Sequence, residues 1–450
     1  MTPEVVRRYA APVPRYTSYP TANHFKAVVG PGEQSRWLAG VGESAKVSLY
    51  VHIPFCHTLC WYCACTTKMT RRPEPVRRYL VALEQEIDRV AEQLAHGKSR
   101  GHKITHMHWG GGSPSLLDPD SIRRLGAALR TRFDLAEDME FAVEVDPREI
   151  TAEQVAAFAE IGVNRVSLGV QDFNQKVQDA INRQQSFELT RDIIEQFRAR
   201  GVASVNIDLV YGLPHQTVDS VKETIAQVLQ LEPDRIAIFG YAHLPSRVTH
   251  QRLIDESALP GIDERFAQSN ALAHAVTHHG YRAVGLDHFA RASDTMASRP
   301  VTRNFQGYTT DAADVLIGLG ASAISSFPEG YAQNAVAVGD YERRIAQGGS
   351  GTARGLVLSE DDKVRAKVIE RLMCDFTFSA RDLLATFGEA ARPVVEEAAD
   401  IADLERDGIV TRTADGFELT RLGRPLVRTV CARFDSWLGG HAMRRHALAV

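Results

Sequence analysis

Six short segments rich in apolar and β-branched residues recur through the first 245 positions of the chain, with amphipathic stretches between them. Each segment is short and apolar enough to be a strand buried on both faces, as the strands of parallel sheets are. The pattern therefore predicts strands at Val47–Pro54, Thr105–Gly111, Glu140–Pro147, Arg165–Gln171, Ser204–Gly212 and Arg235–Ala242.

The stretches between these segments carry apolar residues at helical spacing. Thr151 and Gln154 form a capping-box pattern, which marks the start of a helix. The predicted helices are Pro75–Leu94, Ala152–Ile161, Phe187–Arg200 and Thr217–Leu229. Strands alternating with helices predict βα units, and we expect an α/β fold, a partial six-stranded (β/α)6 TIM-like barrel. A doubly wound open sheet stays an alternative, because the spacing does not reveal whether the sheet closes.

Polar and glycine-rich residues follow or end every predicted strand. In a barrel the chemistry takes place at the carboxyl ends of the strands. In chain order these residues are Cys56, Gly110–Pro114, Glu144, Gln171, Asp208 with Tyr211, and Tyr241–Pro245. Their positions predict a single site at the mouth of the barrel.

The pattern changes after about residue 355. We expect four helices and a small hairpin there, which together are typical of a winged-helix-like module. The helices are Ser359–Cys374, Ala380–Phe387, Pro393–Asp407 and Leu422–Trp437, and the hairpin strands are Gly408–Thr411 and Gly416–Leu419. The predicted organisation is an N-terminal arm (1–45), the barrel with an extension (46–355) and a mainly helical C-terminal domain (356–450). We expect this domain to pack over the barrel mouth rather than to bind DNA.

Composition places the chain among ordinary globular proteins. It has 450 residues, 44% of them hydrophobic and 24% charged, with a net charge of −4. This balance favours neither nucleic acid nor an anionic membrane surface as a partner. No apolar run approaches the roughly 18 residues of a membrane span, and the N-terminus lacks the apolar core of a signal peptide. We expect a soluble, cytoplasmic protein, and the lack of a coiled-coil pattern favours a monomer.

Four cysteines, Cys56, Cys60, Cys63 and Cys65, crowd into ten residues after the first strand. The first three have the spacing C-x3-C-x2-C. A [4Fe–4S] cluster normally takes four thiolates on separate irons, so three on one loop leave an iron free to bind a chelating small molecule. Structural zinc sites use paired C-x2-C units, and no second pair exists here. Spacing alone leaves open whether Cys65 is a fourth ligand.

The loop resembles the signature of the radical S-adenosylmethionine superfamily. Further segments make almost the whole chain similar to the oxygen-independent coproporphyrinogen III oxidases. They are Pro14–Pro20, His108–Gly112, Glu144–Glu149, Gly169–Phe173, Asn206–Pro214, Asp287–Arg291 and Arg303–Thr309. Cys65 and the Asn304–Tyr308 segment separate this family from the related haem chaperones. The chain departs from the family pattern at Ala64, where glycine is usual, and at Ser113, where threonine is usual.

The resemblance implies anaerobic haem biosynthesis, in which two propionates of coproporphyrinogen III become vinyl groups and protoporphyrinogen IX is formed. An unactivated propionate C–H bond offers no acidic proton to a general base, whereas a radical from cleaved S-adenosylmethionine can take the hydrogen atom. The resemblance also implies an electron donor such as flavodoxin or ferredoxin. A haem chaperone of the same superfamily and a radical haem-degrading methyltransferase are the alternatives.

The resemblance further implies roles for individual residues. Cys56, Cys60 and Cys63 would bind the [4Fe–4S] cluster, and Cys65 would be a catalytic residue outside the ligand set. Two S-adenosylmethionine molecules would be bound, with Glu144 suited to a ribose hydroxyl and Arg183 to a carboxylate of methionine or of a propionate. The predicted cofactor-binding residues are Tyr50, Tyr62, Gly111, Gly112, Ser113, Glu144, Gln171, Arg183, Asp208, Ala242 and Ile324. Arg15 and Tyr16, in the arm, would meet the anionic tetrapyrrole.

Overall fold

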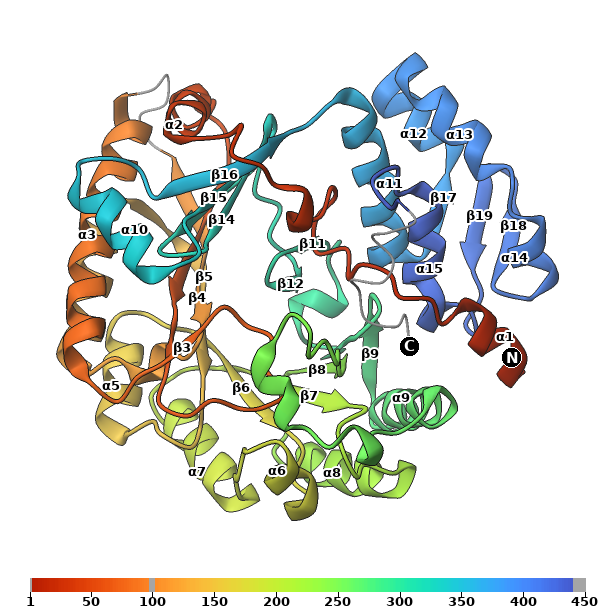
Figure 1. The fold of residues 1–450 in the computed structure, drawn as a ribbon, viewed down its shortest axis with the longest axis horizontal. Helices are drawn as coiled ribbons and strands as arrows, with labels where there is room; N and C mark the ends of the chain where they lie inside the picture. Colours follow the sequence, from red (N-terminus) through yellow and green to blue (C-terminus); the bar gives the residue numbers. More distant parts are fainter. Residues whose placement is uncertain (1, 97–101, 440–450) are drawn as a thin grey trace.

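A twelve-stranded, mostly parallel sheet forms the centre of the computed structural model, which describes residues 2–96 and 102–439 (Figure 1). The ends of the predicted terminal domains, residue 1 and residues 440–450, lie outside the described residues. All six predicted strands are present and lie side by side, each parallel to the next. They are β1 (Val47–Ile53), β4 (Lys103–Gly111), β5 (Asp134–Val145), β6 (Arg165–Gln171), β7 (Ser204–Tyr211) and β8 (Arg235–Gly240).

These six strands follow one another in the sheet in the order in which they occur in the chain. Right-handed crossovers in one unbroken direction place the connecting helices on the same face, as in the wall of a barrel. A doubly wound sheet would reverse its strand order at one point, so that alternative is wrong. The connecting helices are α3 (Pro73–His96), α4 (Pro119–Arg132), α5 (Ala152–Glu160), α6 (Gln175–Ala180), α7 (Phe187–Arg198) and α8 (Val218–Gln230). The predicted capping box at Thr151 and Gln154 is confirmed.

The expectation of six strands undercounts the sheet. A seventh parallel strand, β13 (Val315–Leu319), pairs with β1. Antiparallel strands continue both ends, and the two edge strands, β16 and β9, are not neighbours in the strand order, so the wall is open. The antiparallel strands are β14 (Ile324–Phe327), β15 (Gly330–Asn334), β16 (Thr352–Val357), β10 (His288–Arg291) and β9 (Tyr281–Val284). They are short and most are joined by turns rather than helices, which is why the strand–helix alternation did not reveal them.

The remaining elements of the barrel and its extension lie around this wall. Two small ladders are formed by β2 (Phe55–Cys56) with β3 (Lys68–Met69) and by β11 (Thr302–Asn304) with β12 (Gly307–Thr309). Two further helices, α9 (Ile262–His278) and α10 (Val338–Ala346), pack mainly on α8 and α3 respectively.

The C-terminal domain contains helices around a three-stranded antiparallel sheet with the order β17-β19-β18. Its elements are α11 (Glu360–Asp375), β17 (Thr377–Ser379), α12 (Ala380–Phe387), α13 (Arg392–Ala398), α14 (Ala402–Arg406), β18 (Val410–Thr413), β19 (Gly416–Leu419) and α15 (Val427–Cys431). The predicted hairpin is present, whereas the three-residue strand β17 escaped sequence analysis. The predicted boundary at residue 355 falls within β16.

Two predicted helices of this domain are wrong in extent. Pro393–Asp407 is two helices, because the chain leaves the helical path at Ile401, whose side chain is buried. Leu422–Trp437 is a short α15 between two 3-10 turns. A Cβ at Gly423 would lie 2.0 Å from the carbonyl oxygen of Ile409, which precedes β18, so the chain passes Ile409 too closely for a regular helix to begin at Leu422.

The N-terminal arm joins the C-terminal domain to the barrel (Figure 1). Its first helix, α1 (Pro3–Tyr9), and the following segment bury Tyr9, Tyr16 and Tyr19 in the same apolar core as the C-terminal helices. Its second helix, α2 (Pro31–Gly40), packs on α3 and β16. The arm is therefore an integral part of the packing.

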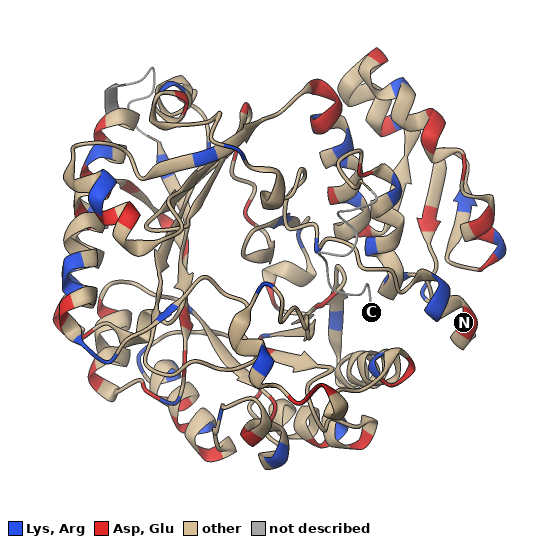
Figure 2. Ribbon diagram, viewed as in Figure 1, with Lys and Arg blue, Asp and Glu red and all other residues tan. Residues whose placement is uncertain are grey.

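Acidic and basic residues are interspersed along the outer helices (Figure 2). Within the residues that the structure covers, no helix combines the length and the apolar character that crossing a membrane requires.

Candidate active site

The cysteine-rich loop runs between β2 and β3 and is fastened by neighbouring loops on two sides. On one side the Asn182 side chain donates to the Leu59 carbonyl at 2.9 Å. On the other, His250 donates to the Cys63 carbonyl at 2.6 Å. Gln251 donates to the carbonyls of Tyr62 at 2.8 Å and Ala242 at 3.0 Å. These contacts hold the thiols at the end of the barrel where sequence analysis expected them.

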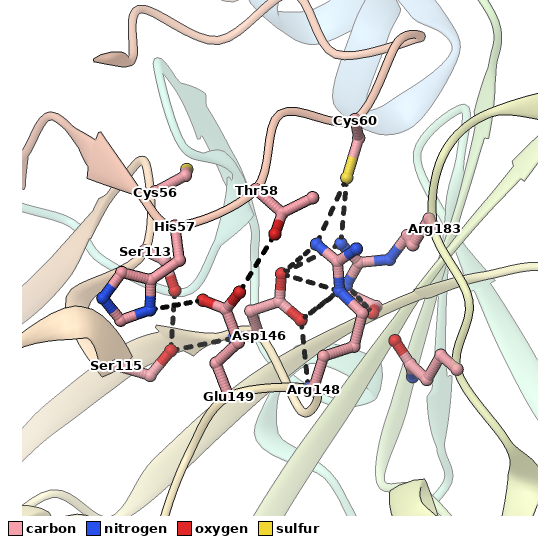
Figure 3. Close-up of polar contacts among 12 residues, drawn as sticks. Cys56, His57, Thr58, Cys60, Ser113, Ser115, Asp146, Arg148, Glu149 and Arg183 are labelled. Atoms are coloured by element: carbon pink, nitrogen blue, oxygen red, sulfur yellow. Dashed lines mark hydrogen bonds and ion pairs between the residues drawn. The ribbon is translucent and has the colours of Figure 1, made fainter. Parts of the chain in front are cut away.

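Two arginines reach the sulfur of Cys60 from the strand-end loops (Figure 3). Arg148 Nη2 and Arg183 Nη1 each lie 3.4 Å from Cys60 Sγ. The carboxylate of Asp146 joins the two guanidinium groups, at 2.6 Å from Arg148 Nη2 and 3.1 Å from Arg183 Nη1. Burial raises the pKa of Asp146, but the two arginines outweigh it and hold that pKa well below its usual value. The sulfur therefore sits beside a permanently charged, internally paired network.

All six cysteines are free thiols. Hydrogen bonds from Cys65 lower the pKa of Cys63 to about 7, so the Cys63 thiol is readily deprotonated to a thiolate. No three His, Cys, Asp or Glu side chains within residues 2–96 and 102–439 are arranged to hold a single metal ion. A [4Fe–4S] cluster takes each thiolate on a different iron, so its ligands need not converge on one point. Three free thiols on one loop, with two cationic donors beside them, fit such a cluster.

The glycine run at the end of β4 brings backbone against the side chains of the neighbouring strands. A Cβ at Gly110 would lie 2.7 Å from the Glu144 carboxyl group, and one at Gly111 would lie 2.5 Å from the His52 ring. This leaves Glu144 in contact with the Gly111 amide at 3.1 Å and with His108 Nε2 at 3.0 Å. Burial raises the pKa of Glu144, but these donors outweigh it and the net pKa is lowered. Glu144 is therefore a carboxylate at neutral pH.

A cavity of about 280 Å³ inside the barrel brings together three of the predicted residues, Cys65, Glu144 and Asp208. Asp208 accepts hydrogen bonds from Asn206 at 2.8 Å and Ser167 at 3.1 Å. Burial is the main influence on Asp208, and it raises the pKa of this carboxyl group. Two carboxyl groups with opposite pKa shifts thus line one cavity.

The other predicted cofactor-binding residues are not among the described residues that line this cavity. Tyr50 on β1 is paired with Gly318 on β13, and a Cβ at Gly318 would lie 2.5 Å from the Ile324 carbonyl oxygen, so these three positions form a row. Tyr62 and Ala242 are joined through Gln251. The backbone amides of Gly112 and Ser113 donate to the carbonyls of Ile53, at the end of β1, and Phe55, at the start of β2. Gln171 ends β6 in a left-handed conformation with φ of 71°. Arg183 was expected to bind a carboxylate of methionine or of a propionate. In the structure it binds the carboxylate of Asp146, a residue of this chain.

Sequence analysis missed four residues of this region: His108, Asp146, Arg148 and Gln251. Two lie in the Glu144–Glu149 segment, where alternate positions at a strand end face one way, so Asp146 could have been grouped with Glu144. Gln251 lies in a 3-10 turn far along the chain and carries no sequence signal of its contact with Tyr62.

Comparison with curated proteins decides the family. The chain is 45% identical over 430 residues to the oxygen-independent coproporphyrinogen III oxidase of Bradyrhizobium diazoefficiens, and 43% identical over 437 residues to that of Paracoccus denitrificans. Each alignment covers 95% of both chains. The chain belongs to the family of oxygen-independent coproporphyrinogen III oxidases.

Two domain families and a solved structure agree with this membership. Residues 50–228 match the radical SAM superfamily, and residues 358–426 match the HemN C-terminal domain. The structure of coproporphyrinogen III oxidase HemN from Escherichia coli, a radical SAM enzyme, superimposes with a TM-score of 0.89. That chain is 38% identical, and the match covers 94% of this chain and 98% of the other. Membership of the radical SAM superfamily implies a [4Fe–4S] cluster and S-adenosylmethionine.

Proposed function

We propose that this chain converts coproporphyrinogen III to protoporphyrinogen IX without oxygen, by oxidative decarboxylation of two propionates to vinyl groups. The observation that carries the proposal is the meeting of three free thiols, the Cys60 arginine network and the Glu144–Cys65–Asp208 cavity at one end of the barrel. Bound there, the cluster and S-adenosylmethionine supply the carbon radical that takes a hydrogen atom from a propionate.

The residues around the thiols bind and orient the cofactors. Cys56, Cys60 and Cys63 hold the cluster. Arg148 and Arg183 donate to Cys60, and charge-assisted hydrogen bonds of this kind stabilise a thiolate. Because Glu144 is ionised and fixed by His108, it can accept a ribose hydroxyl without rearrangement. Cys65 lines the cavity beside it as a reactive group outside the ligand set.

Two S-adenosylmethionine molecules are part of the proposal. Tyr50, Gly111, Glu144 and Ile324 serve the first, and Gln171, Arg183, Asp208 and Ala242 the second. Tyr62, on the cysteine-rich loop, and Gly112 and Ser113, which follow β4, are further proposed contacts of the cofactor. The separation of Glu144 on β5 from Asp208 on β7 by one intervening strand supports two sites rather than one.

Further proposals concern organisation and partners. The order helix, strand, two helix regions and hairpin supports a winged-helix-like C-terminal domain, and we propose that it contributes to the tetrapyrrole site rather than to nucleic-acid binding. We also propose a monomer that takes electrons from flavodoxin or ferredoxin. Six free thiols and a thiolate-bound cluster favour a reducing compartment, the cytoplasm.

The test is a turnover assay under anaerobic conditions. The reconstituted, reduced chain should form protoporphyrinogen IX from coproporphyrinogen III when S-adenosylmethionine and a cell extract as electron acceptor are present. The Cys65→Ser variant should keep its iron and lose this conversion. A wild-type chain that binds haem stably and forms no protoporphyrinogen IX would instead be a haem chaperone.

A further inference from the structure

A second, larger cavity lies between the barrel and the C-terminal domain. It has a volume of about 730 Å³, within the range of roughly 300–1,000 Å³ that is typical of small-molecule sites. The barrel side contributes β8, α9 and the β9–β10 connection, and the C-terminal side contributes Phe376 and the 421–428 segment. Phe239 lines both this cavity and the smaller one that holds Cys65, Glu144 and Asp208, so the two adjoin.

The charges of this cavity are unbalanced. Six arginines line it, and among the described residues Asp287 is its only carboxylate. Burial raises the pKa of Asp287, but Arg303 and His288 outweigh it and lower that pKa to about 2, so it contributes one negative charge. Arg428 donates to the Val13 carbonyl at 3.4 Å, and burial together with the neighbouring Arg15 lowers its pKa to about 10.

Three of the arginines come from three separate parts of the chain. Arg15, in the N-terminal arm, donates to the Gly240 carbonyl at the end of β8 at 2.6 Å. Arg303, in the extension, and Arg428, in the C-terminal domain, are buried, with a side-chain exposure of 5% for Arg303. Arg303 lies 3.7 Å from Asp287 and over the Tyr308 ring, yet its Nε and Nη1 donate no hydrogen bond. A buried guanidinium with free donors is costly unless an anion completes it.

The rest of the lining is largely apolar. Phe239, Phe266, Leu286, Phe289 and Phe376 contribute carbon surface beside the arginines. A ligand that matches this lining carries carboxylates on a large apolar body. A tetrapyrrole with propionate side chains has that chemistry, and guanidinium groups bind carboxylates in bidentate geometry.

We propose that Arg303 and Arg428, with Arg15, bind the two propionates of the tetrapyrrole that do not react, on rings C and D, while the reacting propionates pass Phe239 into the barrel cavity. This inference rests on the proposed function and names the substrate contacts of that site. A propionate that leaves as carbon dioxide loses its charge, so an arginine bound to it would stabilise the ground state more than the transition state. Propionates that keep their charge throughout suit the arginines.

Porphyrin binding tests the proposal directly. Coproporphyrin III carries all the propionates, and mesoporphyrin IX carries only those on rings C and D; both are fluorescent and neither is turned over. Titrated into the reconstituted holoenzyme, both should bind the Arg303→Gln and Arg428→Gln variants on the order of 30-fold more weakly than wild type, as expected for loss of one partner of a buried charge pair. Arg428→Lys keeps the positive charge but not the planar guanidinium that binds a carboxylate through two parallel hydrogen bonds. Its affinity for both porphyrins should fall less, by roughly tenfold.

The controls separate this effect from folding and from chemistry. Arg381 is an exposed arginine on α12 of the same domain, paired with Asp415 and outside the cavity, so Arg381→Gln changes the net charge equally and should bind both porphyrins within about twofold of wild type. Iron content and S-adenosylmethionine cleavage without substrate should equal wild type in the Arg303 and Arg428 variants. In turnover, the KM for coproporphyrinogen III should rise far more than kcat falls.

Two results would overturn the inference. One is wild-type affinity of the Arg303→Gln and Arg428→Gln variants for both porphyrins. The other is weaker binding of coproporphyrin III with unchanged binding of mesoporphyrin IX, which would assign the arginines to the reacting propionates. Failure of the proposed function is a separate observation, a wild-type chain that never converts coproporphyrinogen III.

Discussion

Two regions of this chain, the surroundings of Cys60 and the cavity between the barrel and the C-terminal domain, treat charge in opposite ways. Around Cys60, every charged group has a partner of opposite sign, with Asp146 shared by Arg148 and Arg183. In the cavity between barrel and C-terminal domain, six arginines face one carboxylate. Buried ions are costly unless they are paired, so the first region is complete within the protein, whereas the excess of arginine over carboxylate in the second suits an anionic ligand.

The difference reflects what each region has to do. A cluster site must keep one geometry through many turnovers, and a paired network held by backbone contacts provides it. A substrate site must release its product, so the anion that neutralises its arginines belongs to a ligand that binds and dissociates. The imbalance of charge therefore distinguishes the ligand that exchanges from the cofactor that stays.

The largest expected effect comes from the thiols. Replacing Cys56, Cys60 or Cys63 singly by Ser should abolish the visible absorption of bound iron and all S-adenosylmethionine cleavage, because each thiolate holds a different iron. Cys65→Ser is the matched control on the same loop, and it should keep four irons per chain. Iron loss in Cys65→Ser would make Cys65 a ligand and leave no open iron.

The next largest effect concerns turnover. Asp208→Ala removes a buried carboxyl group from the barrel cavity and should lower the rate of S-adenosylmethionine-dependent conversion by roughly 10- to 100-fold, the cost of a hydrogen bond to a charged group. Cluster absorption should be unchanged. An Asp208→Ala chain with the wild-type rate would remove this residue from the proposed second site.

Asp146→Asn tests whether the ion pairs of Asp146 with Arg148 and Arg183 stabilise the region around Cys60. It leaves two buried guanidinium groups without their carboxylate, and we expect a loss of about 3–5 kcal/mol in the free energy of unfolding, measured on the apo chain with denaturant. The folded pKa of Asp146 is depressed, so the wild-type advantage is present above the unfolded pKa of about 3.8 and is lost only as the pH falls through the lower folded value. An advantage that fades between pH 7 and 5 would contradict the pairing.

The smallest effect is expected from Arg428→Gln, on stability rather than on binding. Because burial, and then repulsion by Arg15 and Arg303, disfavours the charged form of Arg428, we expect Arg428→Gln to leave the melting temperature of the unliganded chain equal to or above that of wild type. A clear drop in melting temperature would mean that the contacts of Arg428 within the protein, such as its hydrogen bond to the Val13 carbonyl at 3.4 Å, outweigh this cost, and it would weaken the contrast between the two regions.

The sequence revealed the parts of this architecture that repeat. Six strands alternating with helices, and the capping box at Thr151, follow from local periodicity, and the structure has these strands side by side in chain order in one mostly parallel sheet. β13 to β16 follow no such rhythm, and β17 is only three residues long, so tertiary pairing alone defines them. The break near Gly423 depends on a close approach to Ile409, which is a contact between distant residues.

The residues of the site also fall into two groups, those that the sequence could predict and those that only tertiary contacts reveal. Residues on the cysteine loop and at strand ends, such as Cys60 and Glu144, could be predicted because their spacing and position carry the chemistry. Arg148 was missed because nothing in the sequence says that it reaches a sulfur 88 positions earlier. The meeting of Arg15, Arg303 and Arg428 depends on three segments that only the folded chain brings together.

The stoichiometry of one anaerobic reaction decides whether this chain decarboxylates coproporphyrinogen III with S-adenosylmethionine. Carbon dioxide, 5′-deoxyadenosine and protoporphyrinogen IX should be counted together after the reconstituted chain has acted on coproporphyrinogen III with cell extract present. Two propionates require two cycles, so we predict two molecules of carbon dioxide and two of 5′-deoxyadenosine for each protoporphyrinogen IX. Cleavage of S-adenosylmethionine without any release of carbon dioxide from the tetrapyrrole would contradict the account.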